Sequence, residues 1–155
     1  MKKKLAPVFS ILLIPAVFAF TLIPAAFAWE TPGYWKNRGY RLYGPYPTGL
    51  FDDILVHSNL GGGTCTGDFA YEVLWMDKSV GDATLILAFQ LIAYRLNVAV
   101  LGAYEPPSWA AIAAAAVSAL NAAGGIGADP APGTAIRAEC ISLAHQLDLM
   151  NNDLF

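Results

Sequence analysis

The chain has 155 residues, of which 14% are charged and 56% are hydrophobic, a composition that excludes extensive disorder and predicts one compact domain. Without residues 1–28, which are predicted to be an export signal, it carries 6 Lys and Arg residues against 12 Asp and Glu residues, a formal charge of −6. An acidic chain this poor in lysine is not expected to bind nucleic acid or anionic membranes in a general way.

The first 28 residues have the three parts of a secretory signal peptide. Lys2–Lys4 form the positive start, residues 5–23 are apolar and uncharged, and Ala26-Phe27-Ala28 is a small-residue cleavage site. We therefore predict cleavage after this site and a protein that is secreted, extracellular or at the cell surface. The alternative is a retained membrane anchor, because residues 5–28 contain no charge and are long enough to span a bilayer.

Residues 29–67 are predicted to be an irregular segment, rich in aromatic residues at its start and in glycine at its end. Trp and Tyr provide six of the residues between positions 29 and 46. Pro45 and Pro47 are expected to prevent helix formation there, and the run Gly61-Gly62-Gly63 indicates a flexible loop. We expect the whole segment to pack on the domain that follows it.

Residues 68–155 are predicted to be a mainly α-helical domain, with about four helices in a small bundle. The spacing of apolar residues predicts helices at residues 68–78, 83–101, 109–123 and 135–150. Asp82, Ser108 and Thr134 precede the last three helices and are expected to be their N-caps. Glycines follow the second and third helices and are expected to end them.

The helix expected at residues 83–101 is apolar on almost every side, so we predict that it is the buried centre of the bundle. Gln90, Arg95 and Asn97 interrupt the apolar run, and no stable membrane span is expected after signal cleavage. Together with Tyr94 these polar groups need partners in a buried helix. Interior hydrogen bonds are the expected explanation, and a ligand pocket is the alternative.

Three stretches resemble a group of secreted bacterial and archaeal proteins. Thr31-Pro32-Gly33-Tyr34-Trp35-Lys36-Asn37 resembles their TPGYWKNH motif, and residues 86–97 and 147–152 are similar to their LAHQLIAAKLN helix and LDxYNN end. The resemblance implies secretion and a helical domain, and the function of that group is unassigned. It supplies no activity to this chain, in which Arg38 and Phe89 stand where the group has histidine.

Cys65 and Cys140 are the only cysteines, and an even pair in an exported protein predicts a disulfide. Two free, separately packed cysteines are the alternative. A zinc site with His57 and His145 is disfavoured, because Cys140 and His145 are five residues apart on one predicted helix and so point in different directions. We expect no metal ion and no other cofactor.

The acidic residues offer a second class of function. Glycoside hydrolysis needs two carboxylates across a cleft, and Asp52, Asp53, Glu72 or His57 could perform acid–base chemistry. A small secreted hydrolase that acts on polysaccharide or cell-wall material is therefore the alternative function. The sequence shows no complete catalytic set, so a non-enzymatic protein is favoured and no catalytic residue is assigned.

The most distinctive feature is the mixture of aromatic and basic residues near the predicted new N-terminus. Half of the positive charge outside the signal lies at Lys36, Arg38 and Arg41. Aromatic rings stack on sugars and on guanidinium groups, and aromatic residues with arginine are enriched at interface hot spots. The candidate binding residues are Tyr34, Trp35, Lys36, Arg38, Tyr40, Arg41 and Tyr43.

The alternative for this segment is that its aromatic rings pack on the helices and complete the hydrophobic core. Both interpretations can hold at once, with Trp35 in the core and Tyr40 and Tyr43 exposed. We predict a non-enzymatic extracellular or cell-surface protein that acts by binding or assembly through this aromatic surface. A protein or a glycan is the expected partner, self-assembly is a further possibility, and nucleic acid is not expected.

Overall fold

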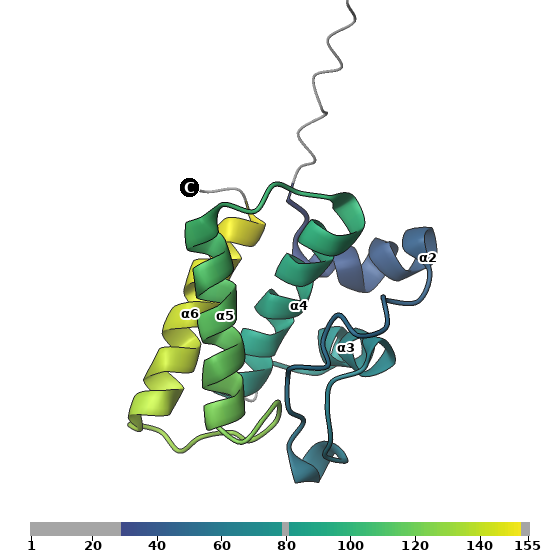
Figure 1. Cartoon of the computed structure of the whole chain (residues 1–155). Helices are drawn as coiled ribbons and strands as arrows, with labels where there is room; N and C mark the ends of the chain where they lie inside the picture. The colour runs from purple at the N-terminus through teal and green to yellow at the C-terminus, as the bar shows by residue number, and fades with distance from the viewer. Residues whose placement is uncertain (1–28, 79–80, 153–155) are drawn as a thin grey trace, which may run out of the picture.

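The computed structural model describes residues 29–78 and 81–152, so the predicted export signal lies outside the described residues. The protein is mainly helical, as predicted. Three long helices, α4 (Ala83–Leu101), α5 (Pro107–Ala122) and α6 (Ala135–Asn151), pack against one another, and the shorter α3 (Gly67–Trp75) lies against α4 (Figure 1). Two isolated β-bridges hold the loops in place. Leu55 pairs with Thr64 within the loop before α3, and Val56 pairs with Ile126 in the loop between α5 and α6.

Side-chain caps explain where the helices begin. The Asp82 carboxylate accepts hydrogen bonds from the backbone N–H groups of Thr84 at 2.8 Å and Leu85 at 3.2 Å, and thereby starts α4. Thr134 starts α6 in the same way. Helix α5 begins two residues earlier than predicted, because Pro107 occupies its first turn and no side chain caps it; Ser108 is inside the helix.

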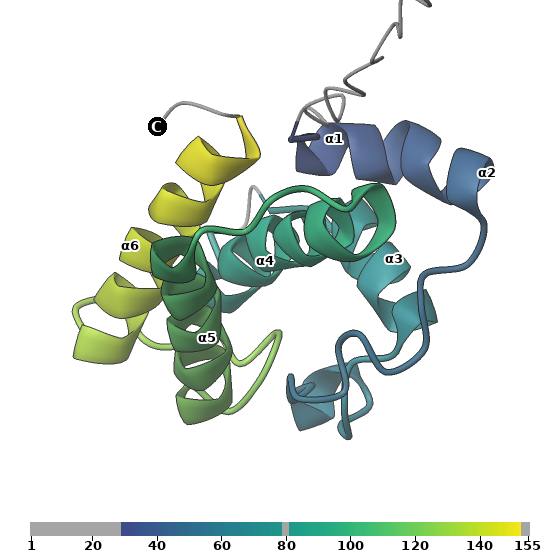
Figure 2. The ribbon, with the colours of Figure 1, turned by 45° about the horizontal axis from the view of Figure 1, so that its top comes forward.

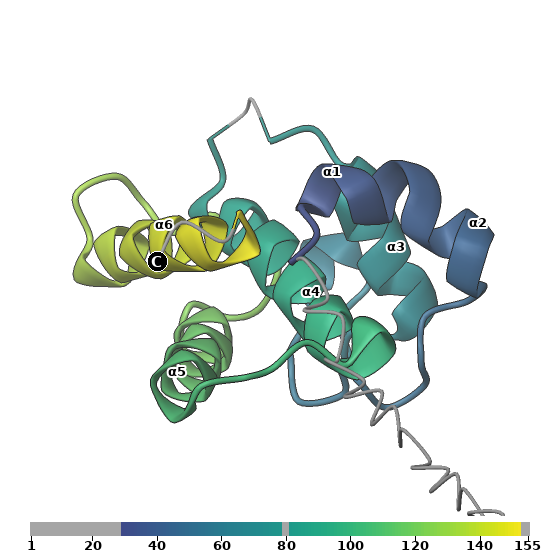
Figure 3. The same ribbon diagram turned by 90° about the horizontal axis from the view of Figure 1, so that it is seen from above.

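Helix α4 is the centre of the molecule, as its all-round apolar character predicted. Its side chains at Leu87, Leu91 and Leu96 are fully buried, and α3, α5 and α6 surround it (Figure 3). Among the described residues α4 is the one helix long and apolar enough to cross a membrane. Burial among the other helices accounts for that apolar composition.

The N-terminal segment differs from the prediction, because much of it is helical. Residues 32–43 form a continuous run of α1 (Pro32–Tyr34), a π-helical turn η1 (Trp35–Gly39) and α2 (Tyr40–Tyr43). Pro32 is favourable in a first helical turn, where its missing N–H is not needed. Pro45 and Pro47 do exclude helix, but they come after the end of α2, where Gly44 has a φ of +79°. Residues 44–66 are irregular as expected, apart from the short 3-10 helix η2 (Ser58–Leu60).

A buried hydrogen-bond network fastens this N-terminal helical run to the bundle. Trp35 Nε1 donates to Asn97 Oδ1 at 3.1 Å, and Asn97 Nδ2 donates to the carbonyl oxygen of Glu30 at 2.8 Å. Asn97 Nδ2 also lies 3.2 Å from Asn151 Oδ1 at the end of α6. Asn151 Nδ2 in turn donates to the backbone and side-chain oxygens of Gln90. The polar stripe of α4 therefore has interior partners, as expected.

The network places the three stretches that carry the sequence resemblance in one location. Trp35 comes from the first stretch, Gln90 and Asn97 from the second, and Asn151 from the third. It also brings the two ends of the described chain to the same end of the bundle (Figure 2). These residues therefore determine how the helices meet.

The predicted disulfide between Cys65 and Cys140 is wrong, because both thiols are free and fully buried. The backbone N–H of Cys65 bonds to Ile54, next to the part of the chain that contacts Arg95. Cys140 lies one turn after Arg137, which bonds to the Gly81 carbonyl before the start of α4. Each thiol is therefore packed separately, which is the alternative that the sequence left open.

Candidate functional site

The predicted aromatic site divides into a buried part and an exposed part. Trp35 is fully buried and Tyr46 nearly so, and the Tyr46 hydroxyl donates to the Trp35 carbonyl at 3.0 Å. Gly39 lies against the indole ring of Trp35 and leaves no space for a side chain. Burial, with the nearby hydroxyls of Tyr71 and Tyr40, raises the pKa of Tyr46. Trp35, one of the predicted binding residues, is therefore a core residue.

The rings of Tyr34 and Tyr40 lie between core and solvent. The hydroxyls of Tyr34 and Tyr43 share a hydrogen bond of 3.4 Å, which raises the pKa of Tyr34 to about 12. Tyr40 stacks on Tyr71 of α3 with a centroid distance of 4.2 Å and an interplanar angle of 30°. The exposed ring of Trp75 lies one turn further along α3, 6.3 Å from Tyr71. The surface thus extends from the N-terminal helices onto α3.

Sequence reasoning missed this α3 part of the site. Tyr71 and Trp75 are spaced i, i+4 and so lie on one side of a helix, whereas the apolar spacing at residues 68–78 served only to predict a helix. Trp75 is 51% exposed, and the ammonium group of Lys36 lies 4.4 Å from its ring centroid. The i, i+4 pair of large aromatics was the signal in the sequence that could have identified it.

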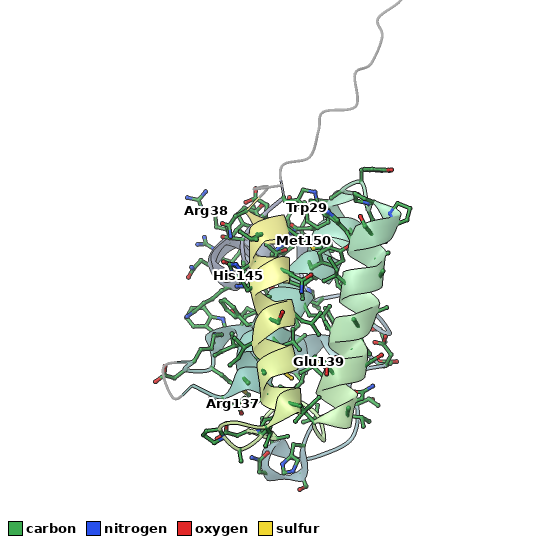
Figure 4. All side chains as sticks on the ribbon, turned by 90° about the vertical axis from the view of Figure 1, so that its left-hand side faces the viewer. Trp29, Arg38, Arg137, Glu139, His145 and Met150 are labelled. Carbon is green, nitrogen blue, oxygen red and sulfur yellow. The ribbon has the colours of Figure 1, made fainter. Side chains whose placement is uncertain are left out.

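We call this set of side chains, all exposed except the half-buried Lys36, the aromatic–basic face. Its members come from the N-terminal helical run and from α3 and are Lys36, Arg38, Arg41, Leu42, Tyr43 and Trp75. Leu42 is 65% exposed and Tyr43 47% exposed, and Arg38 extends away from the bundle (Figure 4). Next to Trp75 lies a shallow open groove of about 490 Å³, lined also by Tyr71, Glu72 and Met76.

The charge of the aromatic–basic face is not neutralised within the described part of the chain. Arg95 pairs with Asp53 and Arg137 pairs with Asp129, and these are the two ion pairs among residues 29–78 and 81–152. Lys78 donates instead to two backbone carbonyls. The other three cations outside the signal are those of the face. Its positive charge is therefore available to an external partner, whereas the rest of the surface is acidic.

A second feature is an open cleft of about 800 Å³ between α4, α5 and the loop at residues 49–53, which we call the α4–α5 cleft. Its apolar side consists mostly of alanine and valine from the two helices. Its polar groups include Asp52 and two internally bonded pairs. Arg95 bonds to Asp53 through two parallel contacts of 2.5 and 2.6 Å, and the Tyr94 hydroxyl donates to Glu105 at 2.8 Å.

These pairs have consequences for protonation in the α4–α5 cleft. The hydrogen bond from Arg95 lowers the pKa of Asp53, so this carboxyl stays ionised. Burial, together with the hydrogen bond to Glu105, raises the pKa of Tyr94. Asp53 is neutralised by its partner, so Asp52 and Glu105 are the acidic residues of the cleft without a basic partner among the described residues.

The cleft brings together only part of the residues predicted for acid–base chemistry. Asp52 and Asp53 both line it, and Glu105, from the loop between α4 and α5, joins them. Glu72 lies in the groove on α3 instead. His57 lies in a loop, where its Nδ1 accepts from the Asn59 N–H at 3.4 Å.

Metal-ligating side chains do not gather in the described residues. His145 is exposed on α6 (Figure 4), far along the chain from the loop that holds His57. Within residues 29–78 and 81–152, no group of three or more His, Cys, Asp or Glu side chains could hold a metal ion. Burial raises the pKa of the Cys65 thiol to about 12 and also raises that of Cys140, so neither thiol is a ready nucleophile.

No protein-family model matches this chain, and comparisons with curated proteins and with solved structures found no match. The resemblance of its three short stretches to an exported group therefore stays a prediction. The aromatic–basic face and the α4–α5 cleft are the two features of the structure that bear on its function.

Proposed function

We propose that this chain is an exported, non-enzymatic protein that acts outside the cell by binding through the aromatic–basic face. The observation that carries the proposal is the group of three cations without an internal ion pair around the exposed side chains of Tyr43 and Trp75. Aromatic residues and arginine provide most of the energy at protein interfaces. Unpaired surface charge also guides the approach of an oppositely charged partner.

The chemistry of the face favours an acidic protein surface over a glycan. Leu42, its most exposed apolar residue, offers no flat ring on which a sugar can stack. The Lys36 ammonium group lies over the ring of Trp75 and occupies part of the flat surface that a sugar would need. Two arginines, by contrast, provide planar donor groups that match carboxylates.

Site-specific photo-crosslinking in the producing cells tests this proposal. Tyr43 and Ile141 are both 47% exposed, so a photoreactive amino acid at position 141 on α6 is a matched control for one at position 43. We expect protein adducts at position 43 that disappear when Arg41→Glu is added, and none at position 141. No adduct at position 43, or equal adducts at both positions, would contradict the proposal. Adducts with polysaccharide alone would identify a glycan partner and also contradict it.

The alternative function, a small hydrolase that acts on polysaccharide or cell-wall material, is supported by the shared position of Asp52 and Glu105 in one cleft. Asp53 does not fit the role of general acid, because that role needs a raised pKa and Arg95 lowers the pKa of this carboxyl. Release of sugar fragments that is lost in both Asp52→Asn and Glu105→Gln would establish the hydrolase. If the unchanged protein releases no sugar fragments, the hydrolase function is rejected.

A further inference from the structure

We propose that the partner of the aromatic–basic face is a second copy of this chain, and that the tip of α2 on one copy docks into the α4–α5 cleft of the next. The inference rests on the proposed function and names its partner. Two surfaces of the same chain support it. The tip of α2 is basic and the α4–α5 cleft is acidic, and each also presents apolar side chains.

The tip of α2 consists of Arg41, Leu42 and Tyr43, three consecutive residues that are all exposed. Gly44 turns the chain away directly after them with a φ of +79°, a conformation that favours glycine. The tip therefore projects at the edge of the molecule (Figures 1 and 2). It offers one unpaired positive charge beside an aliphatic and an aromatic side chain.

The α4–α5 cleft has the complementary composition. Asp52, which is exposed, and Glu105 give it negative charge, because the third carboxylate, Asp53, is already neutralised by Arg95. Its apolar side is lined by Val98 and by residues of α5 that are mostly alanine. Small side chains leave room for an aliphatic or aromatic group from outside. A guanidinium beside Asp52 would meet the carboxylate geometry that it binds best.

The two surfaces face different directions on one molecule. Seen from above, α2 lies at one side of α4 and α5 lies at another (Figure 3). The cleft is lined by residues of α4, α5 and the loop at residues 49–53, and no residue of α2 lines it. The tip of a copy therefore does not fill its own cleft, and the contact joins unlike surfaces of two copies. Such a contact is heterologous and produces a closed ring or an open chain of copies rather than a two-fold dimer.

The size of the contact sets the expected strength. A three-residue tip with its neighbours Lys36 and Trp75 covers less than the roughly 1,200 Å² of total surface that stable specific interfaces bury. The copies also share a net negative charge. We therefore expect weak association that grows with protein concentration.

Charge-reversal variants test the contact. Self-association of the exported protein and of each variant is measured by light scattering over a series of protein concentrations. We expect Arg41→Glu and Asp52→Arg each to weaken self-association about tenfold or more, which corresponds to about 1.4 kcal/mol. The double variant should restore most of the loss, because it recreates the pair with opposite polarity. Glu139→Arg is the matched control, since Glu139 is exposed on α6 (Figure 4) and its reversal changes the net charge as Asp52→Arg does.

Three results would overturn the inference. These are a monomer at every concentration, a loss in the Glu139→Arg variant as large as that in Asp52→Arg, and a double variant as weak as the single ones. Circular dichroism of each variant verifies folding, and Tyr43→Ala against Ile141→Ala tests the same contact without a change of charge.

The crosslinking at position 43 separates this failure from that of the proposed function. Adducts with the mass of two copies support the inference, and adducts with another protein alone reject it while leaving the binding function intact. No adduct at all rejects both. Within a two-copy adduct, a crosslinked peptide that contains residues 49–53 or 105–117 is expected, and one from α6 would contradict the docking site.

Discussion

Replacement of Asn97 by alanine tests the network that joins the N-terminal helices to the bundle. Asn97 is fully buried. It accepts from the Glu30 N–H at 2.9 Å and from Trp35 Nε1 at 3.1 Å, and it donates to the Glu30 carbonyl and to Asn151. No other residue of α4 contacts all three of these partners by hydrogen bonds. We therefore expect Asn97→Ala to be one of the most destabilising single changes in the chain.

The magnitude follows from what the substitution leaves behind. Trp35 and Asn151 are both fully buried, so the indole N–H and the amide oxygen lose a partner in a place that water does not reach easily. Each buried group without a partner costs about 1–3 kcal/mol. The backbone groups of Glu30 are nearer to solvent and cost less. We expect a loss of about 3–5 kcal/mol, a large share of the roughly 5–15 kcal/mol that stabilises a typical domain.

Urea unfolding followed by circular dichroism measures this loss as a change in the free energy of unfolding. The matched control is Asn37→Ala, because Asn37 is exposed and makes a single 2.8 Å bond to the Gly33 carbonyl within its own helical turn. We expect the control to lose less than about 1 kcal/mol. A loss below about 1 kcal/mol for Asn97→Ala itself would refute the view that this network holds the segment in place.

Three further predictions concern the core, the thiols and the ion pair. Gly39→Ala places a methyl group 2.3 Å from the Trp35 ring, so we expect a loss of about 1–3 kcal/mol and a lower melting temperature. Free buried cysteines predict no reaction with a thiol reagent in the folded protein and two reacting thiols per chain in urea without reductant; no reaction in urea would show a disulfide. Arg95 lowers the pKa of Asp53 in the folded state, so its stabilisation is present above the unfolded pKa and disappears as the pH falls through the folded value. With Asp53 56% exposed, the pair is worth about 0.5–1 kcal/mol, and Asp53→Asn should flatten the acid limb of the stability curve by that amount.

The bundle helices were predictable because their signals are local. The cap at Asp82 and the glycine at position 102 bound α4 at the predicted residues. The helical run at residues 32–43 was not predictable in this way. Two prolines follow it closely in sequence, and what holds it is the distant contact between Trp35 and Asn97, 62 residues apart. A local pattern does not contain that contact.

The residues of the two candidate sites were also predictable only where the signal is local in the sequence. The basic residues and Tyr43 were found because they lie close together in the sequence, whereas Trp75 and Glu105 reach the two surfaces only through packing of α3 and the loop before α5. The cysteine pair failed for a related reason. An even number of cysteines predicts that a disulfide can form, but whether the two thiols meet depends on how the loop before α3 and helix α6 pack, which cysteine spacing does not contain.

The sequence resemblance and the proposed binding surface share Lys36 but otherwise involve different residues of the same segment. Trp35, Asn97 and Asn151, which belong to the resembling stretches, are fully buried and bonded to one another. Their role is to position the N-terminal helical run, since buried amides and an indole cannot touch a partner. Arg38, where the chain departs from the resembling motif, is exposed on the aromatic–basic face. The buried residues of the resembling stretches therefore form part of the scaffold, and the exposed residues outside them, Arg41 to Tyr43 among them, form the surface that we propose as the binding site.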